Sequence, residues 1–356
     1  MGQGRFVQEP AFDSAMLLVD RTPSWINRRL AAWAQCAGCR RIAARGMCGS
    51  RELAQCQPHR DEGSNNHVQP TSERTMTYHT ILVLLDQGPQ RAARSHAAIR
   101  LAKALDCHLV GLAPIGVRMP VAGEAAASGA EFAARGQGTP RDQAGRTTER
   151  FLDECKKAGV RSFDATIDEA DMASSLVRHA HCSDLTILTK ADPAAPDHRT
   201  AQELVEHVVL NSARPTLVLP CAGRFDTIGT IGTNVMVAWD DSRAAARALS
   251  DALPLLRLAK HVQLVTWKEG GVNGDEVLRA RCDELRQWLV RHAVLADVSI
   301  ESTDIDVVEA MLSHAADLRT DLIVMGAYGH TRSSHVQDGT TRGLLAAIEV
   351  PILFSH

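Results

Sequence analysis

The sequence predicts an α/β protein with two doubly wound domains in tandem, each built around a five-stranded, mostly parallel sheet. Short apolar runs that favour strands alternate with helical patterns, which is typical of a parallel sheet. The alternation also occurs twice. "ILVLLD" at 81–86 recurs as "NVMVAWDD" at 234–241, and "SDLTILTK" at 183–190 recurs as "TDLIVMGA" at 320–327. We therefore expect an N-terminal extension at 1–75, a first domain at 76–222 and a second at 223–356.

The opening elements of each repeat predict a β-α-β unit with a right-handed crossover. In the first repeat, a strand at 81–85 stops at Asp86, a turn follows, a helix covers 91–105 and a second strand begins at His108. In the second repeat the strand is followed by Asp240, a helix rich in Ala and Leu, and a strand at 262–267. Asp86 and Asp240 are therefore equivalent, and the apolar strands of both repeats are expected to build a shared core.

Residues 1–75 differ in composition, with ten Arg, no Lys and four of the nine Cys. Only 24–35 has a helical pattern and 60–75 reads as a linker, so we expect a poorly structured extension. The segment leaves three interpretations open: a zinc site, an upstream extension of a protein whose natural start is Met76, or a targeting peptide. Its Cys-x2-Cys pair fits zinc, but the remaining spacings fit no usual finger, and its seven acidic residues argue against targeting. The residues that could bind zinc are Cys36, Cys39, Cys48, Cys56, His59 and His67.

The overall composition excludes some classes of function. A net charge of −3 gives no general electrostatic case for nucleic acid or an anionic membrane as partner. No uninterrupted apolar run of about 18 residues occurs, so no transmembrane helix is expected. Nine cysteines, several of them single in apolar stretches, fit reduced thiols better than a disulfide framework. The expected location is the cytoplasm.

The stretch "GAYGHTRSSHVQDGTT" at 326–341 directly follows an apolar strand and indicates a phosphate site. Gly326, Gly329 and Gly339 would let the backbone approach a ligand closely. Thr340 and Thr341 begin a helix, whose free N–H groups and dipole favour an anion. The alternative is that the glycines form a turn and Thr340 caps the helix.

The spacing Gly-x2-Gly-x9-Gly-Thr in this stretch resembles the ATP-binding signature of the universal stress proteins, and 76–356 resembles their tandem type. The resemblance implies an adenine-nucleotide alpha-hydrolase-like fold and ATP as ligand, with Mg²⁺. It implies that Asp240 lies near the adenine and ribose and Val265 near the base. Room for ribose and phosphates would come from two glycines, and the phosphate tail would be held at the helix start. The complete set implied to bind the nucleotide is Asp240, Val265, Met325, Gly326, Gly329, His330, Gly339, Thr340 and Thr341.

Two departures from the family pattern bear on the site. Asp241 stands where the family often has Gly, and a second carboxylate would weaken nucleotide binding unless it faces solvent or the metal. The first repeat has no glycine between Val160 and Ala222, and acidic residues occupy the corresponding loop. We therefore expect one intact site, in the second domain, and a degenerate first domain.

Three functions remain open at this point. The first is an ATP-binding regulatory or protective module in the stress response, working as a homodimer or an intramolecular domain pair, with an unidentified regulatory protein as partner. The second is a nucleotide-free scaffold. The third is a weak ATPase. No catalytic residue and no dedicated metal site are assigned, and His314 and His335 are taken as ordinary surface or helix histidines.

Overall fold

The computed structural model describes residues 77–116, 139–190, 192–196, 198–221, 231–269, 275–327 and 339–356, all within one compact unit at 73–356. The expectations for the N-terminal extension, including its zinc site, lie outside the described residues. Gly329 and His330 lie outside them too.

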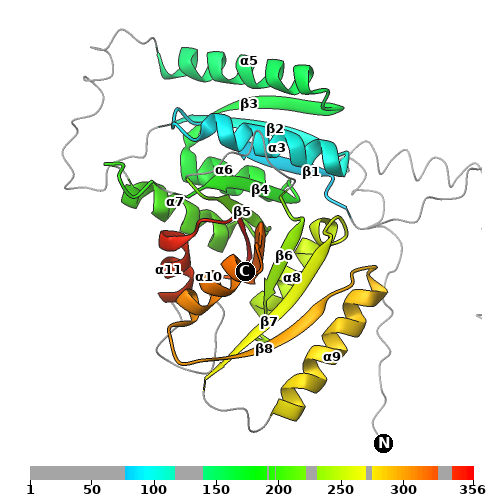
Figure 1. The fold of residues 1–356 in the computed structure, drawn as a ribbon. Helices are drawn as coiled ribbons and strands as arrows, with labels where there is room; N and C mark the ends of the chain where they lie inside the picture. Colours follow the sequence, from blue (N-terminus) through cyan, green and yellow to red (C-terminus); the bar gives the residue numbers. More distant parts are fainter. Residues whose placement is uncertain are drawn as a thin grey trace, which may run out of the picture. The chain divides into compact units, whose positions relative to one another are not determined.

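The described strands form one sheet, and the prediction of a mostly parallel α/β fold is confirmed (Figure 1). Its ten strands are β1 (Thr80–Leu84), β2 (His108–Gly116), β3 (Ser162–Asp171), β4 (Leu185–Thr189), β5 (Thr216–Leu219), β6 (Asn234–Ala238), β7 (His261–Glu269), β8 (Asp297–Thr303), β9 (Leu322–Gly326) and β10 (Ile352–Ser355). The helices are α3 (Arg91–Leu105), α5 (Pro140–Ala158), α6 (Met172–Ala180), α7 (His198–Asn211), α8 (Arg243–Leu256), α9 (Asp275–Arg291), α10 (Val307–Asp317) and α11 (Gly339–Ala347).

The sheet differs from the expected pair of separate five-stranded sheets because β5 and β10 pair with each other. Leu217 and Leu353 lie opposite one another in this antiparallel pair, and every other pairing is parallel. Each of these strands would otherwise leave an unpaired edge of backbone N–H and C=O groups. Joining them satisfies both edges within one chain.

Both halves of the sheet have the same strand order. It reads β3-β2-β1-β4-β5 in the first half and β8-β7-β6-β9-β10 in the second. The order therefore reverses between β1 and β4 and again between β6 and β9. In doubly wound sheets, ligands bind at such reversals, outside the carboxyl ends of the strands.

Helices cover both faces of the sheet. One apolar core contains side chains from α3, α5, α8 and α9, and the other contains side chains from α6, α7, α10 and α11. Each core includes residues from both halves, as expected for a shared core. Within the described part of the chain, none of the helices combines the length and apolar character that crossing a membrane requires.

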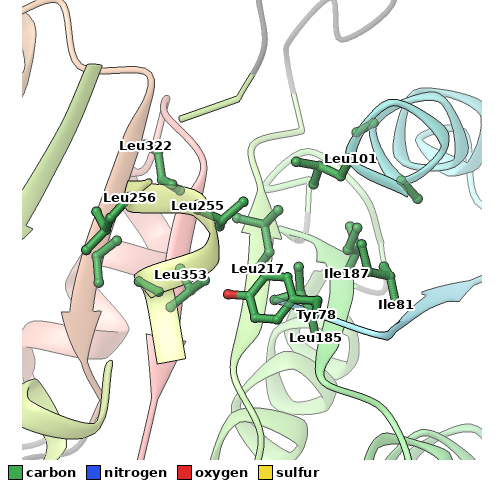
Figure 2. Close-up of a cluster of buried hydrophobic side chains, with 14 of the residues drawn as sticks. Tyr78, Ile81, Leu101, Leu185, Ile187, Leu217, Leu255, Leu256, Leu322 and Leu353 are labelled. Carbon is green, nitrogen blue, oxygen red and sulfur yellow. The ribbon is translucent and has the colours of Figure 1, made fainter. Parts of the chain in front are cut away.

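The junction between the halves is packed by large apolar side chains around Tyr78 (Figure 2). Leu185 and Leu217 come from the first half and Leu353 from the second, and Tyr78 is only 4% exposed. Its hydroxyl donates a hydrogen bond of 2.6 Å to the carbonyl of Asp251 in α8. Packing and this bond together tie the start of the first half to the second.

Local sequence explains where the helices begin. In α5, Thr139 and Asp142 form a reciprocal capping box and Pro140 opens the helix. Ser242 caps α8 by accepting a hydrogen bond of 3.0 Å from the Ala245 N–H. This cap fixes the direction in which the chain leaves β6, and the loop it forms carries Asp240.

Candidate functional site

The carboxyl ends of β6, β7 and β9 bring two predicted site residues, Val265 and Met325, to the same level as Ala238. Ala238 pairs with Val265, and Val237 pairs with Val324, so Met325 lies beside Ala238 on its other side. Ala238, Val265 and Met325 all point into the core that α10 and α11 cover, and Val265 is fully buried. These side chains form the floor of the site, so a ligand above them would meet Val265 through its backbone.

Asp240 follows β6 after one residue, Trp239, and its side chain is exposed at this edge. Its Oδ1 accepts a hydrogen bond of 3.0 Å from the Ser242 N–H, which holds the carboxylate at the turn into α8. No ion pair neutralises Asp240 within the described residues. An exposed carboxylate at a point of strand reversal is a suitable acceptor for hydroxyl groups of a ligand.

Asp241 has a positive φ of 57°, in the left-handed region that glycine adopts most easily. Asp is one of the few other residues that tolerate it, because its short side chain can bond locally. Its Oδ1 accepts a hydrogen bond of 3.0 Å from Nη2 of Arg281 in α9. This hydrogen bond is the main reason why the pKa of Arg281 is raised. The additional carboxylate is therefore directed towards α9, on the other face of the sheet from Val265 and Met325.

Gly326 lies at the end of β9, where the sheet meets the first turn of α8. A Cβ atom there would lie 2.5 Å from the Ala244 C and Ala245 N atoms. Real Cβ atoms do not approach backbone so closely, so this glycine is needed for packing. The sequence predicts either ligand access or a turn at this glycine, and nothing in the local pattern indicates contact with α8.

The other predicted phosphate-binding positions lie at the start of α11. Gly339 begins the helix, and Thr341 is 2% exposed. The helix packs on the same core as Met325, through Leu344. α11 therefore lies on the face of the sheet towards which Val265 and Met325 point.

No protein-family model and no curated protein matches this sequence. Solved structures do match it. A universal stress protein from Archaeoglobus fulgidus is 15% identical, with a TM-score of 0.56 over 77% of this chain and 97% of that one. The chain has the universal stress protein fold. A candidate universal stress protein from Pseudomonas aeruginosa is 17% identical, with a TM-score of 0.50 over 78% of this chain and 93% of that one.

The first half repeats this fold but differs at the equivalent strand ends. Leu84, Leu112 and Leu188 take the positions of Ala238, Val265 and Met325, by register and by burial in the same core. Ala238, the smallest of the three side chains in the second half, is thus replaced by Leu84 in the first half. The floor of the first half is correspondingly fuller.

The acidic residue is also used differently in the first half. Asp86 Oδ1 lies 2.7 Å from Nη2 of Arg94, a side chain only 3% exposed. The same guanidinium bonds the Leu84 carbonyl at 2.8 Å and the Thr189 hydroxyl at 3.0 Å, so it bridges the ends of β1 and β4. By the spacing of buried positions, Arg94 corresponds to Ala245 in α8. Of the two equivalent aspartates, Asp86 is neutralised by a buried arginine, whereas Asp240 has no such partner among the described residues.

Proposed function

We propose that this chain is a tandem universal stress protein that binds ATP with Mg²⁺ at the carboxyl ends of β6, β7 and β9. The proposal rests chiefly on the contrast between Asp240, which is exposed and has no ion-pair partner within the described residues, and Asp86, which a buried arginine neutralises. Both stand at a reversal of strand order, where the fold class binds ligands. Only the second half therefore keeps its carboxylate available.

Two segments of the second half would bind different parts of the nucleotide. Asp240 would accept hydrogen bonds from the ribose hydroxyls. The N–H groups of the first turn of α11, at Gly339, Thr340 and Thr341, would face the phosphates, which a helix N-terminus favours. Gly329 and His330 complete the proposed set by resemblance. Mg²⁺ would supply positive charge that offsets the repulsion among the phosphates.

Such binding fits a regulatory or protective role in the stress response. A ligand bound between Asp240 and the start of α11 would shift the population of the chain towards the conformations that bind it. The proposed partners are a second copy of the chain or a regulatory protein, and the expected compartment is the cytoplasm. We expect binding without dedicated turnover.

The test is calorimetric titration of the full chain with ATP and Mg²⁺, comparing Asp240→Asn with the matched variant Asp86→Asn. We expect about one site per chain and an affinity about tenfold lower in Asp240→Asn, since a charge-assisted hydrogen bond is lost. The affinity of Asp86→Asn should stay within about twofold. Equal losses in both variants would contradict a single site in the second half.

A nucleotide-free scaffold is the second candidate, and one observation favours it. Val265 is fully buried and Met325 is 7% exposed, so their side chains offer little surface to an adenine ring. Absence of any ATP binding at millimolar concentration would support the scaffold. Phosphate release that depends on ATP and is lost in Asp240→Asn would instead support a weak ATPase.

A further inference from the structure

We propose that the chain has a second ligand site, a groove between α8 and α9 that binds a small aromatic anion. This α8–α9 groove has a volume of about 440 Å³, and its lining includes Trp239, Trp288, Leu285, Arg243, Arg281 and Arg291. The volume is within the range of small-molecule sites, which combine apolar walls with a few placed polar groups. Nothing in the proposed ATP function requires such a groove.

The charge of the α8–α9 groove favours an anion. Arg281 is already committed, because it bonds Asp241 at 3.0 Å and Glu284 at 2.7 Å. Arg243 and Arg291 have no hydrogen bond or ion pair within the described residues. Three guanidinium groups thus face two carboxylates, which leaves positive charge uncompensated. Arg243 is also the first residue of α8, where the helix dipole adds to it.

The apolar walls favour a flat ring. Trp239 is 7% exposed and its backbone N–H bonds the Val265 carbonyl at 2.9 Å, so its position is fixed by β7. Trp288 packs against the His292 ring, with centroids 4.2 Å apart. Large indole faces held in place bind other planar groups well. The Trp239 indole nitrogen is buried and has no acceptor within the described residues, so the wall holds a donor that no described group satisfies.

The two proposed sites lie on opposite faces of the sheet. Trp239 belongs to the core beneath α8 and α9, whereas Val265 and Met325 belong to the core beneath α10 and α11. In Figure 1, α9 lies along β7 and β8 at the end of the sheet. A ligand in the α8–α9 groove therefore occupies different protein surface from the proposed nucleotide. The arginines provide the planar, two-pronged donors that suit a carboxylate or sulfonate head group.

The probe is 1-anilinonaphthalene-8-sulfonate, an aromatic sulfonate whose fluorescence rises in apolar surroundings. It is titrated into the full chain, alone and in the presence of saturating ATP. The test variant is Arg243→Gln with Arg291→Gln, and the control is Arg286→Gln. Arg286 lies on α9 outside the groove and pairs with Asp283 at 3.3 Å. All these side chains are exposed, so the variants should keep the native fold, which their melting temperatures check.

We expect the double variant to bind the probe at least about tenfold more weakly and the control to stay within about twofold. Binding should persist in saturating ATP and in Asp240→Asn, which separates this site from the nucleotide site. Displacement of the probe by ATP, equal affinity in the double variant, or no binding by the native chain would each overturn the proposal. Loss of ATP binding alone would affect only the function proposed above.

Discussion

Gly326→Ala tests whether the first glycine of the motif serves the fold or the ligand. The new methyl group would lie 2.5 Å from two backbone atoms of α8, at Ala244 and Ala245. Gly326 cannot move away easily, because its strand, β9, pairs with β6 along one edge and with β10 along the other. Forcing extra volume into such a packed site typically costs about 1–3 kcal/mol, and contact with backbone on both sides indicates the upper end. We therefore expect a loss of about 3 kcal/mol.

The assay is thermal and urea unfolding of the full chain, where a loss of this size lowers the melting temperature by roughly 6–12 °C. Gly343→Ala is the matched control, because its Cβ would lie 3.5 Å from Val308 Cγ2 of α10, which is an ordinary contact between the two helices. Alanine is favoured over glycine inside helices by about 0.5–1 kcal/mol, so this variant should be slightly more stable. A Gly326→Ala protein as stable as the native one would refute the packing explanation.

Three further predictions concern single contacts. The Ser175 hydroxyl, aided by the Arg178 guanidinium, lowers the pKa of Asp168 below its ordinary 3.8. Asp168→Asn should therefore lose about 1–2 kcal/mol at neutral pH, with the difference beginning to shrink as the pH falls below the ordinary value of 3.8 towards the lower folded-state pKa of Asp168. Burial raises the Tyr78 pKa well above 10.0. The stability of the native protein should therefore fall above about pH 10, and more steeply than the stability of Tyr78→Phe. At neutral pH, Tyr78→Phe should be about 1 kcal/mol less stable than the native protein, because the hydrogen bond to Asp251 is lost. Lys190 Nζ donates a hydrogen bond of 2.5 Å to the Ala346 carbonyl at the end of α11. Lys190→Met should therefore lower the stability of the protein by about 0.5–1 kcal/mol and weaken ATP binding a few-fold.

Each of these has a measurement that decides it. Unfolding of Asp168→Asn and native protein is followed from neutral pH to about pH 3, where a constant difference would contradict the ionised pair. Alkaline unfolding curves of the native protein and Tyr78→Phe that run parallel would exclude the buried phenol as their cause. Lys103→Met is the control for Lys190→Met, since Lys103 Nζ bonds the Ala158 carbonyl at 2.6 Å and so caps α5 in the first half. It should lower stability without changing ATP affinity, and equal effects of both variants on ATP binding would contradict a role through α11.

The fold class could be predicted because each element carries its own local signal. The helix expected at 91–105 is α3 to the residue, and the short apolar runs became buried parallel strands. The joining of β5 and β10 could not be read in the same way. Edge pairing depends on which strands lie at the ends of each half, and no single strand sequence encodes its neighbours. The Tyr78 bond to Asp251 joins residues 173 positions apart, which a local pattern cannot reveal.

The asymmetry between the two halves is visible in the sequence as a missing glycine motif with an acidic loop in its place. The structure adds a physical cause at the aspartate itself, which in the first half is held by Arg94. One signal was available, because Arg94 stands three residues before Ala97 and seven before Leu101, on the core-facing side of α3. A charged residue at such a position needs a buried partner. The carboxylate nearest to Arg94 in the sequence is Asp86, which makes it the first candidate partner, and the structure shows this pair. By the same reasoning Ala245 offers Asp240 no such partner, and no other arginine pairs with it in the part of the chain that the structure describes, which makes the second half the one to test for nucleotide.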